Sequence, residues 1–284
     1  MKKRLPQKNT PDLWIDRFRW PKADSHKYNR GYAIINGGDL GQTGAAKIAA
    51  YCALRVGAGV VSVACTPKSL PSYSASFQSI MTKLVKDRSA FSNLISDERI
   101  TAVLLGPGNG VNARTKSFVI DALRQKKSLV LDADALTVFS KAPNYLFKLI
   151  ASPCILTPHE GEFLHLFGKF RFAKNDNIYR AQKAADESGA VIVLKGFHTV
   201  IAAPDGRFVV NTNATPFLAT AGSGDALAGI CTGLLAQGMP MFEAACAAVW
   251  IHADAASHFG PGLISEDIAD LLPLVLRRLR KYKK

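Results

Sequence analysis

Short, continuous apolar runs separated by helix-like segments constrain the fold of this chain most strongly. Continuous apolar runs are typical of strands that are covered on both faces, as in a parallel sheet. The sequence therefore predicts a three-layer α/β/α fold with a central, mostly parallel sheet. The predicted strands are residues 32–36, 60–64, 101–105, 128–131, 154–156 and 190–194. The predicted helices are residues 45–56, 111–125, 176–188 and 244–258.

Nearly every predicted strand is followed by a glycine-rich or polar cluster. Ligands of open α/β sheets bind outside the carboxyl ends of the strands, so we expect these clusters to form one shared site. The clusters are residues 37–44, 106–110, 132–134, 157–162 and 195–199. A Pro-Asp-Gly turn at residues 204–206 predicts a hairpin of residues 199–203 and 208–210. Residues 66–98 are polar and mixed, and they give no clear prediction.

The composition predicts a single domain. The chain has 284 residues, of which 48% are hydrophobic, and no Pro-, Gly- or Ser-rich linker divides it. A chain of this length can bury one large core. Residues 1–24 are polar and contain prolines, so we expect them to form an extended N-terminal arm. We expect residues 25–284 to form the domain.

The charge is strongly basic, with 36 Lys and Arg against 22 Asp and Glu, a formal net charge of +14. Much of it lies at the two ends, where solvated tails are the favoured interpretation. A field that attracts anionic ligands such as nucleotides is the alternative. No basic stripe with interleaved aromatic residues and no known binding module is present, so we expect no nucleic-acid partner.

The cysteines and the hydropathy indicate a cytoplasmic protein. Five cysteines are scattered without a C-x-x-C pair, which is typical of buried thiols in a reducing compartment and not of disulfides or zinc ligands. No apolar run reaches the ~20 residues of a membrane-spanning helix, and no export signal is visible at the N-terminus. We therefore expect no membrane association.

The small-residue loop 220–224 leads directly into an apolar helix and has the features of a phosphate site. Gly222 and Gly224 allow a tight turn. Free N–H groups at a helix start, with the positive end of the helix dipole, attract anions. Asp225 would then be placed to accept a proton from an attacking hydroxyl group. The alternative is an ordinary loop with an N-cap.

Other polar clusters also have two interpretations each. For His159, we favour contact with a polar substrate over the alternative that it caps the next helix. Asp132 and Asp134 cap a helix, which we slightly favour, or they orient a hydrated Mg²⁺ ion. Lys195 and its following glycine bind a nucleotide, or they form a surface turn. No H-E-x-x-H spacing occurs, so we expect no zinc site and assign no protein metal ligand.

His252 and His258 lie on the Ala-rich predicted helix 244–258. We interpret both as ordinary helix residues and not as ligands. The small residues of this helix are suited to close packing against a neighbouring helix.

Several motifs together resemble the ADP/ATP-dependent NAD(P)H-hydrate dehydratases of the ribokinase-like superfamily. The resemblance covers roughly residues 25–275, and its strength lies in the order and spacing of the motifs, because each motif alone is weak. The motifs are Ser25-His-Lys-Tyr-Asn-Arg-Gly31, Thr43-Gly-Ala-Ala46, Arg55-Val-Gly-Ala-Gly59, Leu105-Gly-Pro-Gly108, Leu131-Asp-Ala-Asp-Ala-Leu136, Leu156-Thr-Pro-His-Glu-Gly-Glu162, Val193-Leu-Lys-Gly196 and Ala221-Gly-Ser-Gly-Asp-Ala-Leu-Ala-Gly229.

The resemblance implies a ribokinase-like fold and a repair enzyme. Such enzymes use ADP or ATP, with Mg²⁺, to phosphorylate the hydroxyl group of NADH hydrate or NADPH hydrate at C6 of the nicotinamide ring. Loss of phosphate then restores the cofactor. By position, Asp225 would be the catalytic base. The hydrate would be bound by Ala45, Gly108, His159 and Asp225. The nucleotide would be bound by Lys195, Gly196, Phe197, His198, Thr199, Gly222, Ser223 and Gly224.

The chain departs from the family pattern in two ways. Many members have Gly-Thr-Gly-Asp where this chain has Gly-Ser-Gly-Asp, a change that keeps the hydroxyl group. Many bacterial members carry a fused epimerase domain, and this chain is too short to hold one. The resemblance also implies a homo-oligomer, a tetramer, and leaves the preference for ADP or ATP open.

Three rival functions remain at this point. A vitamin-precursor or sugar kinase of the same superfamily would keep Asp225 but release a stable phosphorylated product; the segments around His159 and Gly108 argue against it. A non-catalytic nucleotide sensor would not need Asp225. A basic nucleic-acid binder would show salt-dependent retention on DNA.

Overall fold

The computed structural model describes residues 6–173 and 176–282, and its centre is a nine-stranded sheet within those residues. The strand order is β3-β2-β1-β4-β5-β6-β7-β8-β9. The strands are β1 (Tyr32–Asn36), β2 (Val60–Cys65), β3 (Met81–Leu84), β4 (Ala102–Leu105), β5 (Ser128–Leu131), β6 (Cys154–Leu156), β7 (Val191–Leu194), β8 (Thr199–Ala202) and β9 (Phe208–Asn211). Each strand predicted from an apolar run is present, with its ends shifted by at most one residue.

The sheet is parallel from β3 to β7 and antiparallel from β7 to β9. The parallel strands bring their carboxyl ends to one edge, as expected for a βα succession. The predicted hairpin is the β8–β9 pair, in register from Thr199 opposite Asn211 to Ala202 opposite Phe208. The three-layer, mostly parallel fold predicted from the sequence is confirmed.

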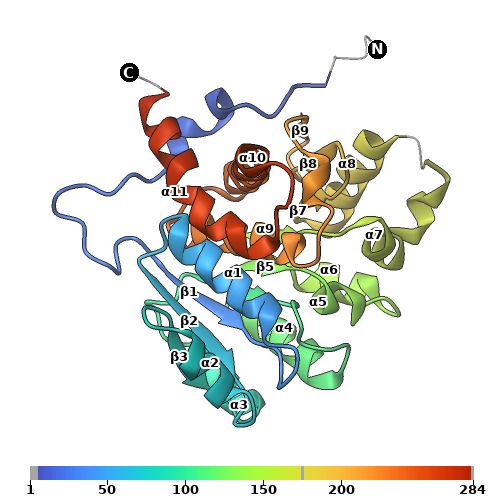
Figure 1. Ribbon diagram of the computed structural model, residues 1–284. Helices are drawn as coiled ribbons and strands as arrows, with labels where there is room; N and C mark the ends of the chain where they lie inside the picture. The colour runs from blue at the N-terminus through green and yellow to red at the C-terminus, as the bar shows by residue number, and fades with distance from the viewer. Residues whose placement is uncertain (1–5, 174–175, 283–284) are drawn as a thin grey trace.

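Helices cover both faces of the sheet (Figure 1). Adjacent strand residues face opposite layers: Ile35 packs in one hydrophobic cluster and Ile34 in the other. The helices on the Ile35 side are α1 (Gly44–Arg55), α2 (Leu70–Ser76), α9 (Ser223–Ala236), α10 (Met241–Phe259) and α11 (Ser265–Lys281). Those on the Ile34 side are α3 (Arg88–Ile95), α4 (Ala113–Arg124), α5 (Asp134–Thr137), α6 (Pro143–Leu149), α7 (Glu160–Phe167) and α8 (Asn177–Ser188).

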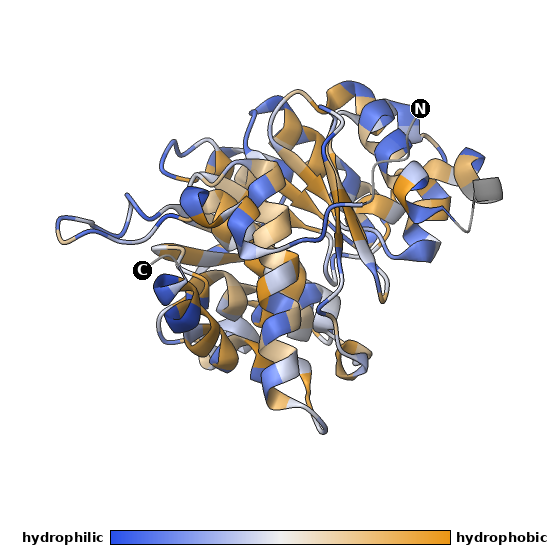
Figure 2. Ribbon diagram, turned by 90° about the horizontal axis from the view of Figure 1, so that it is seen from above, coloured by the Kyte–Doolittle hydropathy of each residue, from blue (hydrophilic) through white to orange (hydrophobic). Residues whose placement is uncertain are grey.

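The hydropathy of the chain follows these layers. The strands are largely apolar, and polar residues gather on the outer faces of the helices (Figure 2). Helix α9 is apolar around most of its circumference, because it lies between the sheet and the helices α1 and α10, and its residues from Ala226 to Ala236 are buried. Among the helices of residues 6–173 and 176–282, none is both long and apolar enough to cross a membrane.

The prediction of an extended N-terminal arm is wrong for residues 11–17. They form two short 3₁₀ helices, η1 (Pro11–Leu13) and η2 (Ile15–Arg17). The Trp14 side chain is 1% exposed and belongs to the hydrophobic core. Its Nε1 donates to Asn9 Oδ1 at 3.2 Å, and Asn9 Nδ2 donates to Asn211 Oδ1 and to the carbonyl of Cys246. The division into an arm and a domain stays a prediction.

Candidate active site

The loop before α9 makes a tight turn at one residue. Gly222 is the N-cap of α9 and has a positive φ of 86°, a region that side chains disfavour. A Cβ atom at this position would lie 2.8 Å from Ile48 Cδ1, so the turn also packs closely against α1. The Ser265 hydroxyl donates to the carbonyl of Ala221 at 2.6 Å. These contacts fix the direction in which α9 begins.

The start of α9 has unpaired donors. Within the described part of the chain, no hydrogen-bond acceptor meets the backbone N–H groups of Gly224 and Asp225. A helix start with free N–H groups and a positive dipole end is suited to binding a phosphate. A Cβ atom at Gly224 would lie 3.4 Å from the ammonium nitrogen of Lys195, so a cation stands beside the same helix start.

A cavity of about 480 Å³, here called the α9 cavity, opens beside this helix start. Six of the eight residues predicted to bind nucleotide line it, and they come from the β7–β8 connection and from α9: Lys195, Gly196, Phe197, Thr199, Ser223 and Gly224. His198 and Gly222, the other two, lie next to these in the chain and are not among the lining residues. Apolar side chains, among them Leu218, Leu227 and Val249, form much of the remaining wall.

The β8–β9 hairpin reaches the α9 cavity with one end only. Thr199 and Asn211, at its open end, line the cavity, whereas Gly206, at its tip, lines a different cavity beside Phe242 and Glu243. The hairpin therefore borders the cavity where we predict nucleotide binding, but only through its open end. Strand β8 starts near the carboxyl end of β7 and runs antiparallel to it, so the tip is carried to the opposite edge of the sheet.

Lys195 is the centre of a buried charge cluster. Its Nζ lies 2.8 Å from Asp132 Oδ1 and 3.8 Å from Glu162 Oε2. Burial lowers the pKa of the Lys195 ammonium, but Asp132 and Glu162 outweigh burial and raise that pKa above its ordinary value. Lys195 is therefore a cation at neutral pH. Its side chain is largely buried, so the interpretation as a surface turn fits only the exposed residues 196–198 that follow it.

Neither aspartate of the 132–134 cluster caps a helix, contrary to the slightly favoured interpretation. Asp132 accepts from Lys195, and Asp134 Oδ2 accepts from the backbone N–H of Gly110 at 2.7 Å. The N-cap of α5 is Ala133, which provides no side-chain cap. The two carboxylates instead tie together loops that follow three different strands.

Asp225 lies in the first turn of α9 with a perturbed acidity. Burial raises the pKa of its carboxyl to about 6, Asp132 and Glu162 add to the rise, and Lys195 opposes it. A carboxylate of this kind is ionised at neutral pH yet basic enough to accept a proton, the property that a general base needs.

His159 combines a structural contact with access to the α9 cavity. Its Nδ1 accepts hydrogen bonds from the backbone N–H of Gly161 at 2.9 Å and of Glu162 at 3.4 Å. The Glu162 carboxylate in turn accepts from the backbone N–H of His159 at 2.9 Å. This is a capping box at the start of α7. The ring also lines the α9 cavity with more than half of its side-chain surface exposed. The predicted contact with the hydrate stays a prediction.

Ala45, at the start of α1, and Gly108, in the loop after β4, do not line the α9 cavity. Ala45 is in the first turn of α1, and a Cβ atom at Gly108 would lie 2.8 Å from the carbonyl oxygen of Gln42. Asn109 joins this loop to the end of β1 through the Asn36 carbonyl. The predicted substrate residues thus share the carboxyl edge of the sheet with Asp225, from the α1 side, and their contact with substrate stays a prediction.

His252 is a cavity residue that the sequence did not reveal. Its side chain is buried, lines the α9 cavity, and places Nε2 3.2 Å from Ser223 Oγ. Burial lowers the pKa of the imidazole to about 4, so the ring is neutral. The interpretation as an ordinary helix residue overlooked this contact, because it joins residues 29 positions apart and no local pattern signals it.

The carboxylates at this edge are suited to a hydrated Mg²⁺ ion and not to an all-protein metal cage. No group of three or more His, Cys, Asp or Glu residues in the described chain is arranged to hold a metal ion. Mg²⁺ keeps several waters and binds through one or two carboxylates and the phosphates of its substrate. Asp132 and Asp225 could hold such an ion through its waters.

The family comparison agrees with the site. The model of the NAD(P)H-hydrate dehydratase family matches residues 33–269. The ADP-dependent (S)-NAD(P)H-hydrate dehydratase of Neisseria meningitidis is 35% identical over 277 residues, which cover 93% of this chain and 91% of that protein. The bifunctional NAD(P)H-hydrate repair enzyme Nnr of Salinibacter ruber is 36% identical over 276 residues, which cover 91% of this chain and 51% of that protein. The chain thus spans about half the length of the bifunctional relatives that it matches.

Solved structures give the same result. The ADP/ATP-dependent NAD(P)H-hydrate dehydratase from Bacillus subtilis, co-crystallised with ATP/Mg²⁺, superposes with a TM-score of 0.85 at 27% identity, covering 96% of this chain and 99% of that one. A hydroxyethylthiazole kinase from Pyrococcus horikoshii shares only the fold, with a TM-score of 0.60 at 16% identity. The family model, the relatives and the fold lead to one conclusion: the chain belongs to the NAD(P)H-hydrate dehydratase family.

Proposed function

We propose that the protein dehydrates the C6 hydrate of NADH and NADPH at the expense of ADP or ATP and thereby restores the normal cofactor. The observation that carries the proposal is the start of α9, where Asp225, with a pKa of about 6, stands beside free backbone N–H groups and the Lys195 ammonium. Family membership supports the substrate class.

In the first step, the C6 hydroxyl oxygen of the hydrate attacks the terminal phosphorus of the nucleotide. Asp225 accepts the hydroxyl proton, a new O–P bond forms, and the bond from phosphorus to the leaving nucleotide oxygen breaks. The free N–H groups of Gly224 and Asp225 are placed to stabilise the charge that grows on the phosphate oxygens. Bound Mg²⁺ would neutralise part of the phosphate charge.

In the second step, the C6–O bond breaks and inorganic phosphate departs with its bonding electrons. C5 loses a proton, and the electrons of that C–H bond form the C5–C6 double bond of the ring. We propose that Ala45, Gly108 and His159 hold the hydrate, and that residues 195–199 and 222–224 hold the nucleotide. The Lys195 charge, which Asp132 and Glu162 fix in place, would keep the terminal phosphate next to α9.

The test is to incubate the protein with NADH hydrate, Mg²⁺ and either ADP or ATP. We expect the ultraviolet absorbance of the reduced ring to return, with one phosphate released for each ring restored. Asp225→Asn is the matched control. Nucleotide consumption with accumulation of a stable phosphorylated product would indicate a kinase instead, and binding without turnover would indicate a nucleotide sensor.

Two finer proposals concern the state of the protein in the cell. We propose a cytoplasmic enzyme, because all five cysteines are free and buried, as expected in a reducing compartment. The homo-oligomer, a tetramer, rests on the family resemblance alone. Light scattering after size exclusion would give the mass, and a mass of one 30.6 kDa chain would contradict it.

A further inference from the structure

A second cavity, of about 600 Å³, lies far from the catalytic edge. It is here called the arginine cavity. The loop of residues 18–30, which extends beside α11 (Figure 1), forms one wall. The end of α1 and the carboxyl-terminal half of α11 form most of the rest. Arg30 and Gly57 line the cavity and shortly precede β1 and β2, so it is at the amino ends of the parallel strands, opposite to Asp225.

The charge of the arginine cavity is one-sided. Five of its lining residues are arginines, and none is Asp or Glu: Arg19, Arg30, Arg55, Arg277 and Arg280. Arg55 pairs with Asp270 at 3.1 Å, so one of the five positive charges is offset by a carboxylate that does not line the cavity. The carboxyl-terminal ends of α1 and α9 bring about −0.5 charge each, which the other four guanidinium groups outweigh. The lining therefore carries a net positive charge, which favours anionic ligands.

Arg30 is held in place and still has an N–H group without an acceptor in the described residues. Its Nη2 donates to the carbonyl of Gly57 at 3.0 Å. Its Nε is buried and meets no acceptor in the described residues. A guanidinium that is already fixed loses little freedom when it binds an oxyanion, and its fork geometry matches phosphate.

The rest of the lining is aromatic and apolar. Trp20 packs on Phe18 with ring centroids 4.5 Å apart. Tyr51, which is 40% exposed, and Leu54 of α1 also line the cavity. Flat apolar surface of this kind is suited to a planar aromatic base, whereas inorganic polyphosphate would use only the arginines. The volume also lies within the usual range for a small-molecule site.

We propose that the arginine cavity is a second ligand site, separate from the active site, for polyanionic phosphate esters that carry an aromatic base, that is, nucleotide polyphosphates. A second copy of this chain is a poor occupant through the same face, because two clusters of five arginines would repel each other. The proposal does not depend on which reaction occurs at Asp225.

The test is calorimetric titration of the whole protein with ATP in the absence of hydrate. We expect two ATP molecules per chain for the wild type. The variant Arg19→Gln/Arg277→Gln removes two exposed cavity charges that have no ion-pair partner in the described residues. We expect it to weaken one of the two sites at least tenfold and to leave the other unchanged.

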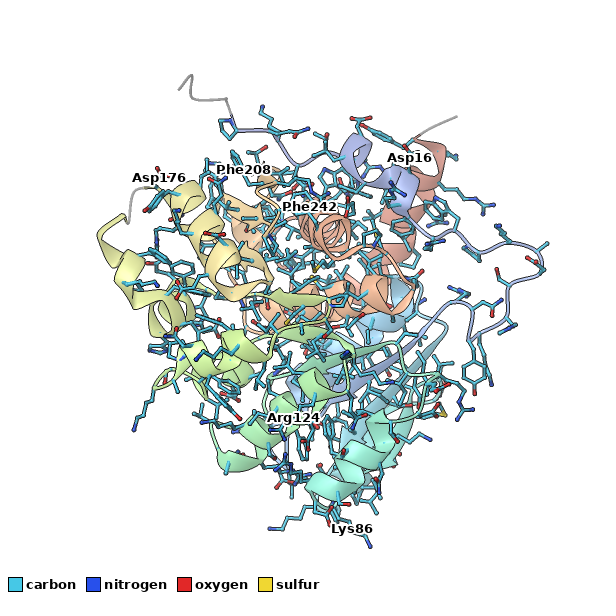
Figure 3. All side chains as sticks on the ribbon, turned by 180° about the vertical axis from the view of Figure 1, so that it is seen from behind. Asp16, Lys86, Arg124, Asp176, Phe208 and Phe242 are labelled. Atoms are coloured by element: carbon cyan, nitrogen blue, oxygen red, sulfur yellow. The ribbon has the colours of Figure 1, made fainter. Side chains whose placement is uncertain are left out.

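The matched control is Lys86→Gln/Arg124→Gln, which removes the same charge from exposed positions outside the cavity. Figure 3 shows Lys86 at the end of the molecule opposite to Asp16 of the N-terminal segment, and Arg124 in the same half as Lys86. We expect this control to keep both sites. Sodium triphosphate, which lacks a base, tests whether the second site recognises the base of ATP. Weaker binding of triphosphate than of ATP would support recognition of the base, and equal binding would contradict it.

Three results would overturn the proposal as a whole. One ATP per chain in all three proteins would remove the second site. If the Arg19→Gln/Arg277→Gln variant binds two ATP molecules as tightly as the wild type does, the second site lies outside the arginine cavity. A DNA oligonucleotide that displaces ATP from the second site and binds more tightly would make the cavity part of a nucleic-acid surface.

Discussion

At the scale of single residues, Asp225 joins basicity to a position beside phosphate. Asp225→Asn keeps the size of the side chain but loses the lone pairs that accept the hydroxyl proton. We expect kcat to fall by ~10²–10⁴-fold and ATP affinity to hold or rise, because a negative charge near the phosphates is gone. Steady-state kinetics and calorimetry measure the two. Near-normal turnover in a folded variant would remove Asp225 from the chemistry.

The raised pKa of Asp225 also has a cost in stability. Because the folded pKa of about 6 exceeds the ordinary 3.8, this carboxyl favours folding below about pH 4, and that contribution is lost as the pH rises through 6. The Asn variant should therefore gain up to about 3 kcal/mol over wild type at pH 7–8, with no gain near pH 4. Wild-type kcat/KM should decline below about pH 6.

His252 has the opposite dependence on pH. Burial lowers its pKa to about 4 from 6.5, so its contribution to stability is present above pH 6.5 and is lost as the pH falls through 4. The loss amounts to up to about 3 kcal/mol. His252→Gln, which can still bond Ser223, should flatten the decline of unfolding free energy between pH 6.5 and 4. The exposed His165→Gln is the control, and an unchanged slope in His252→Gln would contradict the assignment.

At the scale of elements, the start of α7 separates the two interpretations of His159. His159→Ala removes the cap and the ring, whereas His159→Asn removes the ring but keeps a good N-cap. We expect the Ala variant to lose about 1 kcal/mol of stability and the Asn variant to lose little. If the ring contacts the hydrate, both should raise the KM for hydrate more than that for nucleotide. Normal kinetics in His159→Asn would leave a purely structural role.

The two glycines at the start of α9 serve different purposes, which a matched pair of variants can separate. Gly222→Ala strains a φ of 86° and meets Ile48, so we expect a loss of about 1–3 kcal/mol in stability. Gly224→Ala adds a methyl group 3.4 Å from Lys195 Nζ inside a helix, where Ala is favoured by up to about 1 kcal/mol. It should keep stability but weaken ATP binding. Equal ATP affinity in Gly224→Ala and wild type would contradict a phosphate site there.

Elements with buried apolar runs could be predicted from the sequence, and others could not. Strand β3 (Met81–Leu84) is an edge strand whose residues are exposed or only partly buried, so it lacks the apolar run that marks the inner strands. Helix α2 (Leu70–Ser76) buries essentially one side chain, Tyr73. Both lie in the segment 66–98, and their structure follows from packing against β2, which a local pattern does not contain.

At the scale of the whole molecule, the sequence predicted which loops meet but not how their side chains pair. The rule that ligand loops follow parallel strands predicted that the loops of Lys195 and Asp132 share one edge. It could not predict that Lys195 bonds Asp132, 63 positions away, or that His252 reaches Ser223. Such pairings depend on the separation of strands and on side-chain direction, which arise only after folding.

The stability contributed by the N-terminal segment distinguishes a dispensable arm from an integral part of the fold. Trp14 is 1% exposed and its ring centroid lies 5.9 Å from that of Trp250 on α10. Trp14→Ala should therefore cost about 3–5 kcal/mol, as measured by urea unfolding, while Leu40→Ala, at an exposed loop position, should cost little. Deletion of residues 1–24 should cost at least as much as Trp14→Ala. A deletion that unfolds like the wild type would show that residues 25–284 are a complete domain and that the segment is a dispensable arm.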